Sequence, residues 1–538
     1  MLLFSIINAC GGIHNVLRIL APDTRILVEI KDTSLLSSQA KKQNYNKALK
    51  QLTYDKAMIK DNEQLASELL EVGKKIAEQQ KLSIASCTSP VECEYRPSWH
   101  ISPPQGLLND PNGFIYHQGQ YHLFYQWYPY DCVHKDKYWV HLTSKDLIQW
   151  DWQSVPLTPS DWFDSHGVFS GHALSQNDQL MVFYTGNVRI GEQRDRQTMQ
   201  CVASSTDGIH FTKQGPVITE LPPGVTPHCR DPKVFRHDDH WLMLLGAQRE
   251  DEVGRLAVYR SEDLKSWDFV GLSGDELGDF GYMWECPDFF TLNNQDFIVI
   301  GPQGIKSSSK YHTVPHHNGI VKAQLDAQDK FTLSEFQHLD VGFDFYAPQS
   351  LQTPDGRRVM TAWMGLPDEI NQPSIDSGDG WVHQLTTFRE LYFEQGKLLQ
   401  RPLSELKALR REQIIVPKDT HCFDLQSKSF ELNVLLTWGS RIRLHESSTG
   451  YCEIRLEEQS RTLYLDRSNT LMREGDTLRE LALPNSASIH LQIFSDTSSL
   501  EIFINDGEAV MSSRVFTDKT ATKMSFTGDV EIQNSWLF

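Results

Sequence analysis

The stretch Leu-Leu-Asn-Asp-Pro-Asn-Gly at residues 107–113 runs directly into Phe-Ile-Tyr-His-Gln-Gly-Gln-Tyr-His-Leu-Phe-Tyr-Gln-Trp at residues 114–127. Gln118-Gly119-Gln120, at the centre of this β-rich run, predicts a hairpin turn between two strands. Asp110 then lies at a strand end beside a tight turn, where a rigid scaffold can direct a side chain into a cleft. Asn-Asp-Pro-Asn-Gly is also an ordinary turn sequence, so a purely structural role for it stays open.

Residues 97–398 consist of short β-runs separated by turn clusters, with almost no helical periodicity. An imperfect repeat recurs in this region as Ser144-Lys-Asp-Leu-Ile-Gln-Trp150, Ser205-Thr-Asp-Gly-Ile-His-Phe211 and Ser261-Glu-Asp-Leu-Lys-Ser-Trp267. Each copy follows a strand-like stretch, and the period is about 60 residues. Repeated sheet modules are typical of a β-propeller, whose blades bury their faces against one another. The length of the region predicts about five blades.

The chain after the repeat region also indicates β-structure. Alternating strands and the hairpin turn Asn505-Asp506-Gly507 predict an antiparallel β-sandwich over residues 416–538. Residues 399–415 predict a short helical linker. The expected fold class is therefore mainly β, with a five-bladed β-propeller followed by a β-sandwich.

Residues 1–90 predict a small α/β or helical N-terminal extension. A helix to about Asn8, a second short helix after Gly11-Gly12 and a strand over residues 24–30 are expected first. Residues 39–80 are rich in Lys, Glu, Gln, Ala and Leu, with apolar residues near the helical period. That composition predicts one or two further helices.

The composition excludes several classes of function. With 538 residues the chain is too long for one hydrophobic core, so it predicts several domains. No apolar stretch reaches about 18 residues, so no membrane span is expected. A formal net charge of −19 argues against a nucleic-acid partner. The nine cysteines form no CxxC pair, and the apolar N-terminus has no basic side chain before Arg18, which favours a cytoplasmic location over secretion.

Three acidic motifs lie in the repeat region: Asn109-Asp110-Pro111, Arg230-Asp231-Pro232 and Trp284-Glu285-Cys286-Pro287-Asp288. A proline follows each acid within two residues, holds the residue before it extended, and is expected to end the strand there. Strand ends of different propeller blades converge on the central channel, so the three carboxylates are expected to share one pocket. Glycoside hydrolysis needs one carboxylate as nucleophile or base and a second carboxyl group as proton donor. Taken singly, each acid is equally compatible with a turn or a local ion pair.

Residues 98–538 resemble glycoside hydrolase family 32, the invertase and fructanase family. The resemblance begins at Trp-His-Ile-Ser-Pro-Pro-Gln-Gly-Leu-Leu-Asn-Asp-Pro-Asn-Gly, continues through Phe-Arg-Glu-Leu at residues 388–391, and reaches Glu-Ile-Phe-Ile-Asn-Asp-Gly in the sandwich. Residues 281–288, 340–349 and 380–384 are most similar to bacterial sucrose-6-phosphate hydrolases. The family fold is a five-bladed propeller with a β-sandwich, in agreement with the repeat.

The resemblance implies a role for each of the three acids. Asp110 is the expected nucleophile, Glu285 the expected general acid and base, and Asp231 the residue that holds fructose hydroxyls and stabilises the transition state. The resemblance also implies a set of substrate-binding residues: Leu107, Leu108, Asn109, Gln126, His134, Phe169, Ser170, Arg230 and Trp363. His134 stands where many invertases carry tryptophan.

The activity that the resemblance implies is that of a retaining β-fructofuranosidase. Its expected reaction is hydrolysis of sucrose 6-phosphate to glucose 6-phosphate and fructose, with sucrose as a secondary substrate and without a metal or other cofactor. A glucose 6-phosphate group needs cationic donors at the pocket rim, for which the candidates are His134, Lys135, Lys137, Arg189 and Arg249. Invertase or fructan hydrolase activity on unphosphorylated sugars stays open, as do fructosyl transfer and a carbohydrate-binding role for an inactive propeller.

Double displacement sets conditions on the two reacting carboxyl groups. Burial and neighbouring charge are expected to raise the pKa of Glu285, and hydrogen bonds from Asn109 and backbone amides to keep Asp110 ionised. Retention requires the two carboxyl groups to lie about 5–5.5 Å apart. Cys286, beside the acid, is expected to serve in packing.

The N-terminal extension carries a second, shorter resemblance. Gly11-Gly12-Ile-His-Asn-Val16 and Thr24-Arg25-Ile26 are similar to the start of the sucrose-type IIB domain of the sugar phosphotransferase system. That family has a phosphorylated cysteine two residues before Thr-Arg, where this chain has Pro22. A docking or vestigial role, with an unknown partner, is therefore expected in place of phosphate relay.

Overall fold

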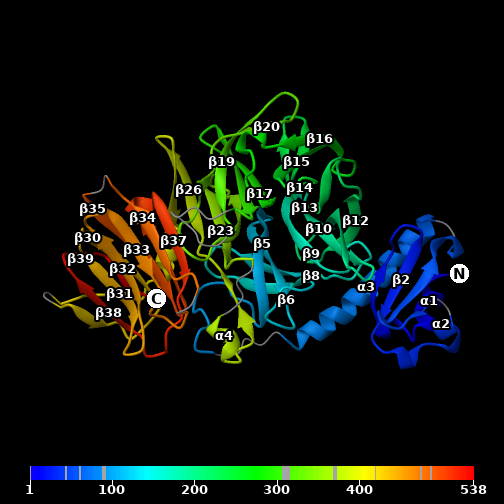
Figure 1. Cartoon of the computed structure of the whole chain (residues 1–538), viewed down its shortest axis with the longest axis horizontal. Coiled ribbons are helices and arrows are strands. Elements are labelled where there is room, and N and C mark those ends of the chain that lie inside the picture. The colour runs from blue at the N-terminus through cyan, green and yellow to red at the C-terminus, as the bar shows by residue number, and fades with distance from the viewer. Residues whose placement is uncertain are drawn as a thin grey trace.

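The structure is a computed structural model. It describes residues 2–42, 45–59, 62–87, 93–305, 315–367, 372–417, 420–472, 475–484 and 487–538. Three parts follow one another along its longest axis: a small N-terminal domain, a central group of β-sheets and a two-layered C-terminal domain (Figure 1). None of the helices in the described ranges is long and apolar enough to cross a membrane.

The N-terminal domain packs helices α1 and α3 against a sheet with the strand order β1-β2-β4-β3. Its elements are α1 (Leu3–Ala9), η1 (Ile13–Asn15), β1 (Val16–Leu20), β2 (Arg25–Ile30), η2 (Thr33–Leu35), α2 (Ser38–Lys42), β3 (Tyr45–Asn46), β4 (Gln51–Asp55), η3 (Lys56–Met58) and α3 (Asn62–Ala85). The long helix α3 leads from this domain to the central sheets (Figure 1).

The predicted helices of this domain are present, but the sequence does not predict all of its strands. The second short helix is the 3-10 helix η1, and the chain continues from it directly as strand β1, because Val16 and Ile19 enter the domain core. Residues 39–80 contain the end of α2 and most of α3, in agreement with the one or two helices that the composition predicts, but β3 and β4 form a hairpin between them. Leu52 and Tyr54 alternate into the same core, so tertiary packing overrides the helical composition.

Five sheets follow one another from Gly106 to Pro402, and their inner strands β5, β9, β13, β17 and β22 contact one another in cyclic order. The first sheet contains β5 (Gly106–His117), β6 (Gln120–Tyr128), β7 (Tyr138–Ser144), β8 (Asp151–Leu157) and β24 (Trp381–Val382). The second contains β9 (Val168–Gln176), β10 (Gln179–Ile190), β11 (Asp195–Ser205) and β12 (Thr212–Ile218). The third contains β13 (Val225–His237), β14 (His240–Arg249), β15 (Gly254–Ser261) and β16 (Asp268–Ser273), followed by the 3-10 helix η4 (Asp275–Leu277).

The fourth sheet contains β17 (Met283–Leu292), β18 (Gln295–Gln303), β19 (Gly319–Leu325), β20 (Phe331–Leu333) and β21 (Gln337–His338). The fifth contains β22 (Tyr346–Gln352), β23 (Arg358–Met364), β25 (Gln384–Leu385), β26 (Arg389–Glu394) and β27 (Lys397–Pro402), and α4 (Pro373–Asp376) precedes β24. Strand β24 pairs with β5, so a late segment of this region completes the first sheet. Strand β27 continues four residues beyond the predicted boundary at residue 398.

The serine–aspartate repeat forms the loop between the third and fourth strands of three consecutive sheets. In the first copy, Asp146 Oδ1 accepts from Ser144 Oγ at 3.1 Å and from two backbone amides that follow it. Asp207 and Asp263 make the same three bonds in the next two sheets. Asp326 holds the corresponding loop of the fourth sheet through two backbone amides without a serine, which hides this copy from sequence comparison.

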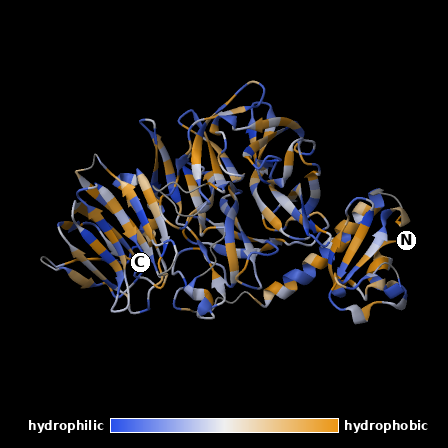
Figure 2. Cartoon of the chain, viewed as in Figure 1, coloured by the Kyte–Doolittle hydropathy of each residue, from blue (hydrophilic) through white to orange (hydrophobic). Residues whose placement is uncertain are grey.

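The C-terminal domain is a sandwich of a seven-stranded and a six-stranded sheet, and the 3-10 helix η5 (Ser404–Leu409), within the predicted helical linker, leads into it. One layer contains β28 (Glu412–Gln413), β40 (Trp536–Leu537), β30 (Phe430–Thr437), β35 (Ser488–Asp496), β36 (Ser499–Ile504), β37 (Ala509–Arg514) and β39 (Val530–Ile532), with η6 (Asn505–Gly507) at the predicted hairpin turn. The other contains β29 (Cys422–Asp424), β38 (Lys523–Thr527), β31 (Arg441–Glu446), β32 (Cys452–Glu457), β33 (Thr462–Asp466) and β34 (Leu478–Ala482). Hydrophobic and hydrophilic residues alternate along these strands (Figure 2), so one face of each sheet fills the shared core.

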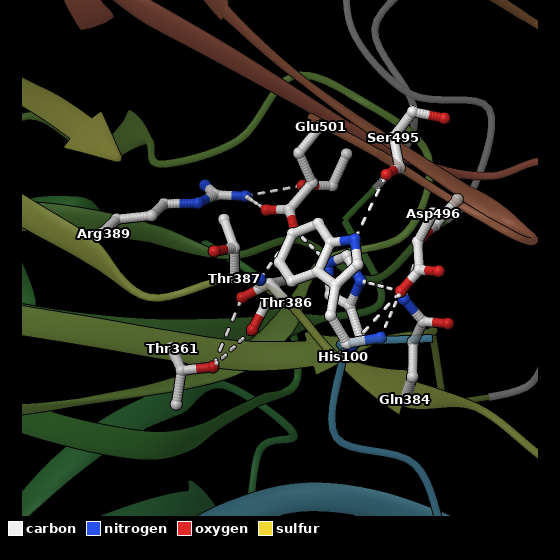
Figure 3. A network of polar contacts seen from close by, with 12 residues as sticks. His100, Thr361, Gln384, Thr386, Thr387, Arg389, Ser495, Asp496 and Glu501 are labelled. Carbon is white, nitrogen blue, oxygen red and sulfur yellow. Dashed lines mark hydrogen bonds and ion pairs between the residues drawn. The ribbon is translucent and has the colours of Figure 1, made fainter. Parts of the chain in front are cut away.

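A buried polar network joins the central sheets to the sandwich (Figure 3). Arg389 of β26 is fully buried and donates to Asp340 Oδ2 at 3.0 Å and to Glu501 Oε2 at 2.9 Å. His100 lies 2.8 Å from Asp496 Oδ2 and 3.0 Å from Glu501 Oε1. Charges from both domains thus compensate one another away from water.

This network makes stability depend on pH. Burial lowers the pKa of His100, but hydrogen bonds and charges of Asp496 and Glu501 outweigh burial and raise it above 6.5. The protonated ring therefore contributes stability that is fully present below pH 6.5 and is lost as the pH rises through the raised pKa. We expect the Tm of the wild type to fall as the pH rises above 6.5, and that of His100→Gln to fall less. Thermal melts at several pH values test this, and equal slopes for the two proteins would contradict it.

Candidate active site

Asp110, Asp231 and Glu285 come from the inner strands β5, β13 and β17 of three different sheets. All three line one cavity of about 380 Å³. The inner strands of the other two sheets contribute Ser170 and Tyr346 to the same cavity. The three acidic motifs therefore meet, as the sequence predicts.

A β-bulge directs each of these acids. The strand register shifts between Leu108 and Pro111, between Arg230 and Lys233, and between Glu285 and Asp288. The prediction that the prolines end their strands is wrong, because β5, β13 and β17 all continue beyond them. Proline has no amide hydrogen for the ladder and is tolerated where a bulge interrupts pairing, while the bulge redirects the neighbouring side chain.

Asp110 is held by its neighbours on two sides. Ser170 Oγ donates to Asp110 Oδ2 at 2.5 Å, and Asn112 Nδ2 donates to the Asp110 carbonyl at 2.9 Å. Burial raises the pKa of Asp110 and the charge of Glu285 adds to the rise, whereas the Ser170 and Asn109 hydrogen bonds and Lys137 oppose it. The result is a pKa above the ordinary value for aspartate.

Glu285 receives hydrogen bonds on both carboxylate oxygens. Arg230 donates to Oε1 from Nε at 3.0 Å and from Nη2 at 2.6 Å. Gln303 Nε2 and Tyr346 OH donate to Oε2 at 2.7 and 2.8 Å. Burial pushes the pKa of Glu285 upward, but the charge and hydrogen bonds of Arg230, with the Tyr346 hydroxyl, outweigh burial and lower it.

This ionisation pattern differs from the expected one. The sequence predicts a raised pKa for Glu285 and an ionised Asp110, whereas in the structure the pKa of Glu285 is lowered and that of Asp110 is raised. The reason is the position of Arg230, whose guanidinium pairs with Glu285 at 2.6 Å and lies 3.9 Å from Asp231. Adjacency in sequence suggests Asp231 as the partner of Arg230, but the fold brings Glu285 closer.

Asp231 is buried, and both the backbone amide and the thiol of Cys286 contact its carboxylate. The Cys286 amide donates to Asp231 Oδ2 at 3.0 Å, and the thiol lies 3.6 Å from Asp231 Oδ2 and 3.7 Å from Asp110 Oδ2. Burial and the charges of Glu285 and Asp110 raise the pKa of Asp231 to about 7 against the opposing charge of Arg230. Burial also raises the pKa of the Cys286 thiol, so this cysteine links the two aspartates as a neutral group.

Most of the predicted substrate-binding residues line the cavity: Asn109, Gln126, His134, Phe169, Ser170, Arg230 and Trp363. Leu107 and Leu108 do not line it, since both are fully buried. Leu107 packs with Cys132 and Val382, and Leu108 belongs to the core between the first and fifth sheets. For these two leucines the structure corrects the prediction.

Four atoms of the cavity wall are buried donors or acceptors without a partner among the described residues. They are Asn109 Oδ1, Asn187 Oδ1, Arg196 Nε and Trp363 Nε1. Buried polar atoms are nearly always hydrogen-bonded, so a ligand rich in hydroxyl groups would supply the missing hydrogen-bond partners of these four atoms. The family resemblance implies Asn109 and Trp363 as site residues but neither Asn187 nor Arg196.

One wall of the cavity is formed by arginines of the hairpin between β10 and β11. Arg189 and Arg196 are direct partners across this hairpin, and Arg194 lies in its turn. Like charges opposite one another destabilise a strand pair. Burial lowers the pKa of Arg196 to about 9, and the charges of Arg230 and Arg189 contribute to the fall. A multivalent anion bound here would relieve this repulsion.

The other candidates for phosphate binding divide into two groups. His134, Lys135 and Lys137 line the cavity, whereas Arg249 lies outside it and pairs with Asp251 at 2.6 Å. Lys137 Nζ lies 2.9 Å from His134 Nδ1. Burial, with the charge of Lys137, lowers the pKa of His134 well below 6.5, so its ring is neutral. His134 is therefore not a cationic donor.

Within the described residues, no group of three or more His, Cys, Asp and Glu side chains is placed to hold a metal ion. The nine cysteines are all free thiols.

Comparison with known families gives two matches that together span most of the chain. The N-terminal domain of glycosyl hydrolases family 32 matches residues 100–402, and the C-terminal domain of the same family matches residues 405–535. The first 99 residues lie before both matches.

Similar proteins carry related names. A probable sucrose-6-phosphate hydrolase of Psychromonas ingrahamii is 70% identical over 537 residues, covering 100% of this chain and 98% of that protein. The sucrose-6-phosphate hydrolase of Bacillus subtilis is 40% identical over 438 residues, covering 78% of this chain and 89% of that protein. Among solved structures, sucrose-6-phosphate hydrolase from Lactobacillus gasseri superposes with a TM-score of 0.78 at 32% identity, covering 86% of this chain and 96% of that one.

Proposed function

Because the chain belongs to glycosyl hydrolases family 32, we propose that it is a β-fructofuranosidase that hydrolyses sucrose 6-phosphate to glucose 6-phosphate and fructose. Sucrose is the poorer substrate in this proposal. The names of the similar proteins support the substrate, and the arginine wall of the cavity supports the phosphate group. The five sheets of the central region act as the five blades of one propeller around the cavity.

The three acids divide the reaction between them. Asp110 attacks the anomeric carbon of the fructosyl unit, and Glu285 protonates the leaving oxygen and then activates water. Asp231 holds fructose hydroxyls and stabilises the positive charge of the transition state. Ser170, 2.5 Å from Asp110, orients the nucleophile.

Glu285 can become protonated only after its carboxylate loses the hydrogen bonds from the Arg230 guanidinium. All four hydrogen bonds to its carboxylate are donated to it, which favours the ionised form. If fructose hydroxyls accept the hydrogen bonds of Arg230, Glu285 Oε1 becomes available to protonate the leaving oxygen. Gln303 and Tyr346 would still donate to Glu285 Oε2. Substrate binding itself would thus raise the pKa of the general acid.

The phosphate of the substrate is assigned to the arginine wall. Arg189, Arg194 and Arg196 present fork-shaped cationic donors, and guanidinium groups bind phosphate in a bidentate manner. The mutual repulsion of these arginines would be offset only when a phosphate dianion binds. A cytoplasmic location belongs to the same proposal, supported by the nine free thiols.

Steady-state kinetics on the two sucroses test this function. We expect the wild type to have a kcat/KM for sucrose 6-phosphate at least about tenfold that for sucrose, as one charge-assisted contact alone provides. In Arg196→Gln the KM for sucrose 6-phosphate should rise by about tenfold while that for sucrose changes by less than about twofold. Arg249→Gln, outside the cavity, is the matched control and should change neither.

Equal kcat/KM values for the two sugars in the wild type would favour the alternative, an invertase or fructan hydrolase acting on unphosphorylated sugars. A mutant β-fructofuranosidase of Bombyx mori, solved in complex with sucrose, is 29% identical to this chain with a TM-score of 0.74 and supports that alternative. Release of no fructose from any β-fructoside would favour a carbohydrate-binding protein. Product analysis at high sucrose concentration measures fructosyl transfer.

A further inference from the structure

The N-terminal domain is docked on the rim of the active-site cavity. Leu20 and Leu27 of its sheet form a buried cluster with Val188 of β10, the residue before Arg189. Helix α3 approaches the central sheets so closely that a Cβ on Gly73 would lie 1.8 Å from Asp161 Oδ1. In Figure 1 the domain lies beside the sheet that contains β9 to β12. It is therefore seated on the sheet that carries the arginine wall.

Arg18 of β1 makes two polar contacts across this interface. Its Nη2 donates to Asp136 Oδ2 at 2.5 Å, and its Nη1 donates to the Ser165 carbonyl at 2.8 Å. Asp136 lines the cavity between Lys135 and Lys137 in sequence. The side chains of Arg18 and Asp136 are only 21% and 27% exposed, so the pair is partly shielded from water.

Asp136 is an acidic side chain on a rim whose neighbouring charged side chains are basic. The arginine wall and Lys135 are cationic, and an uncompensated carboxylate beside them would repel a phosphate dianion. Glu29 of β2 lies behind Arg18, 3.4 Å from its Nε. Burial raises the pKa of Glu29, while the charges of Arg18 and Arg194 lower it and that of Asp136 raises it. Acidic and basic groups thus alternate from Asp136 through Arg18 and Glu29 towards Arg194.

We propose that Arg18 of the N-terminal domain masks the charge of Asp136 and thereby keeps the cavity rim selective for a phosphorylated substrate. This inference rests on the proposed function. Arg18 does not touch the substrate and acts as a positioning residue. The N-terminal domain becomes part of the substrate site, although it lies outside both family matches.

Inhibition of sucrose hydrolysis by glucose 6-phosphate and by glucose tests the masking directly. In Arg18→Ala we expect the inhibition constant of glucose 6-phosphate to rise by about tenfold, since Asp136 loses the partner that masks its charge, and that of glucose by less than about twofold. The KM for sucrose 6-phosphate should rise together with the inhibition constant of glucose 6-phosphate. Arg18→Ala/Asp136→Asn should return to within about threefold of the wild type, because the repelling carboxylate is gone.

Two further variants complete the design. Arg25→Ala removes an exposed arginine of β2 in the same domain and should change neither constant. Asp136→Asn alone should leave glucose 6-phosphate inhibition equal or stronger, which keeps the test decisive if Arg18→Ala does not fold.

An unchanged glucose 6-phosphate constant in Arg18→Ala would overturn the masking, as would a double variant that is not restored or weaker inhibition in Asp136→Asn. A wild type without preference for sucrose 6-phosphate would refute the proposed function alone, since the inhibition constants still decide the role of Arg18.

Discussion

Asp110→Asn is expected to lower kcat by on the order of 10⁴-fold or more while leaving the sugar bound, because the amide cannot attack the anomeric carbon. The exchange is nearly isosteric and keeps an acceptor for Ser170 Oγ, 2.5 Å away in the wild type. Fructose release measures the loss, and calorimetry with sucrose 6-phosphate measures the binding that remains.

Asp178→Asn is the matched control for this variant. Asp178 is exposed in the turn between β9 and β10 with φ at 59°, a left-handed conformation that asparagine also tolerates. We expect its activity to equal that of the wild type. A residual rate of Asp110→Asn within about tenfold of the wild type would refute Asp110 as the nucleophile.

Arg389→Met is expected to lower the free energy of unfolding by about 3–5 kcal/mol, the usual cost of removing one partner from a buried ion pair. Arg389 is fully buried and its Nη2 bonds Asp340 and Glu501, carboxylates that the variant would leave without it. Figure 3 shows the contact of Arg389 with Glu501. Methionine fills part of the volume but supplies no donor. Urea unfolding, followed by tryptophan fluorescence, measures the loss.

Arg401→Met serves as the control for this stability change. Arg401 lies on β27, the neighbouring strand, where its side chain is 37% exposed and 3.7 Å from Glu394. An exposed pair of this kind contributes about 0–1 kcal/mol. If Arg389→Met costs no more than this control, the network of Figure 3 does not hold the two domains together.

Local patterns in the chain predict much of the fold. The strands of the sandwich and the turn at Asn505 follow from alternation and turn chemistry, both of which act between near neighbours. The serine–aspartate repeat indicates sheet modules because its hydrogen bonds close within one loop. The β3–β4 hairpin escapes such analysis, since its burial depends on α1 and α3 elsewhere in the domain.

For the site, the sequence predicted that three acids share one pocket, because a proline follows each of them within two residues. The amide and aromatic groups around them were expected only from the family resemblance. Only the tertiary structure decided the direction in which the pKa of each acid shifts and which charged side chains line the cavity. The pairing of Arg230 with Glu285, the opposition of Arg189 and Arg196, and the seating of Arg18 on Asp136 each join groups by distances through space. Electrostatic energy depends on those distances and on burial, and neither can be read from the order of residues.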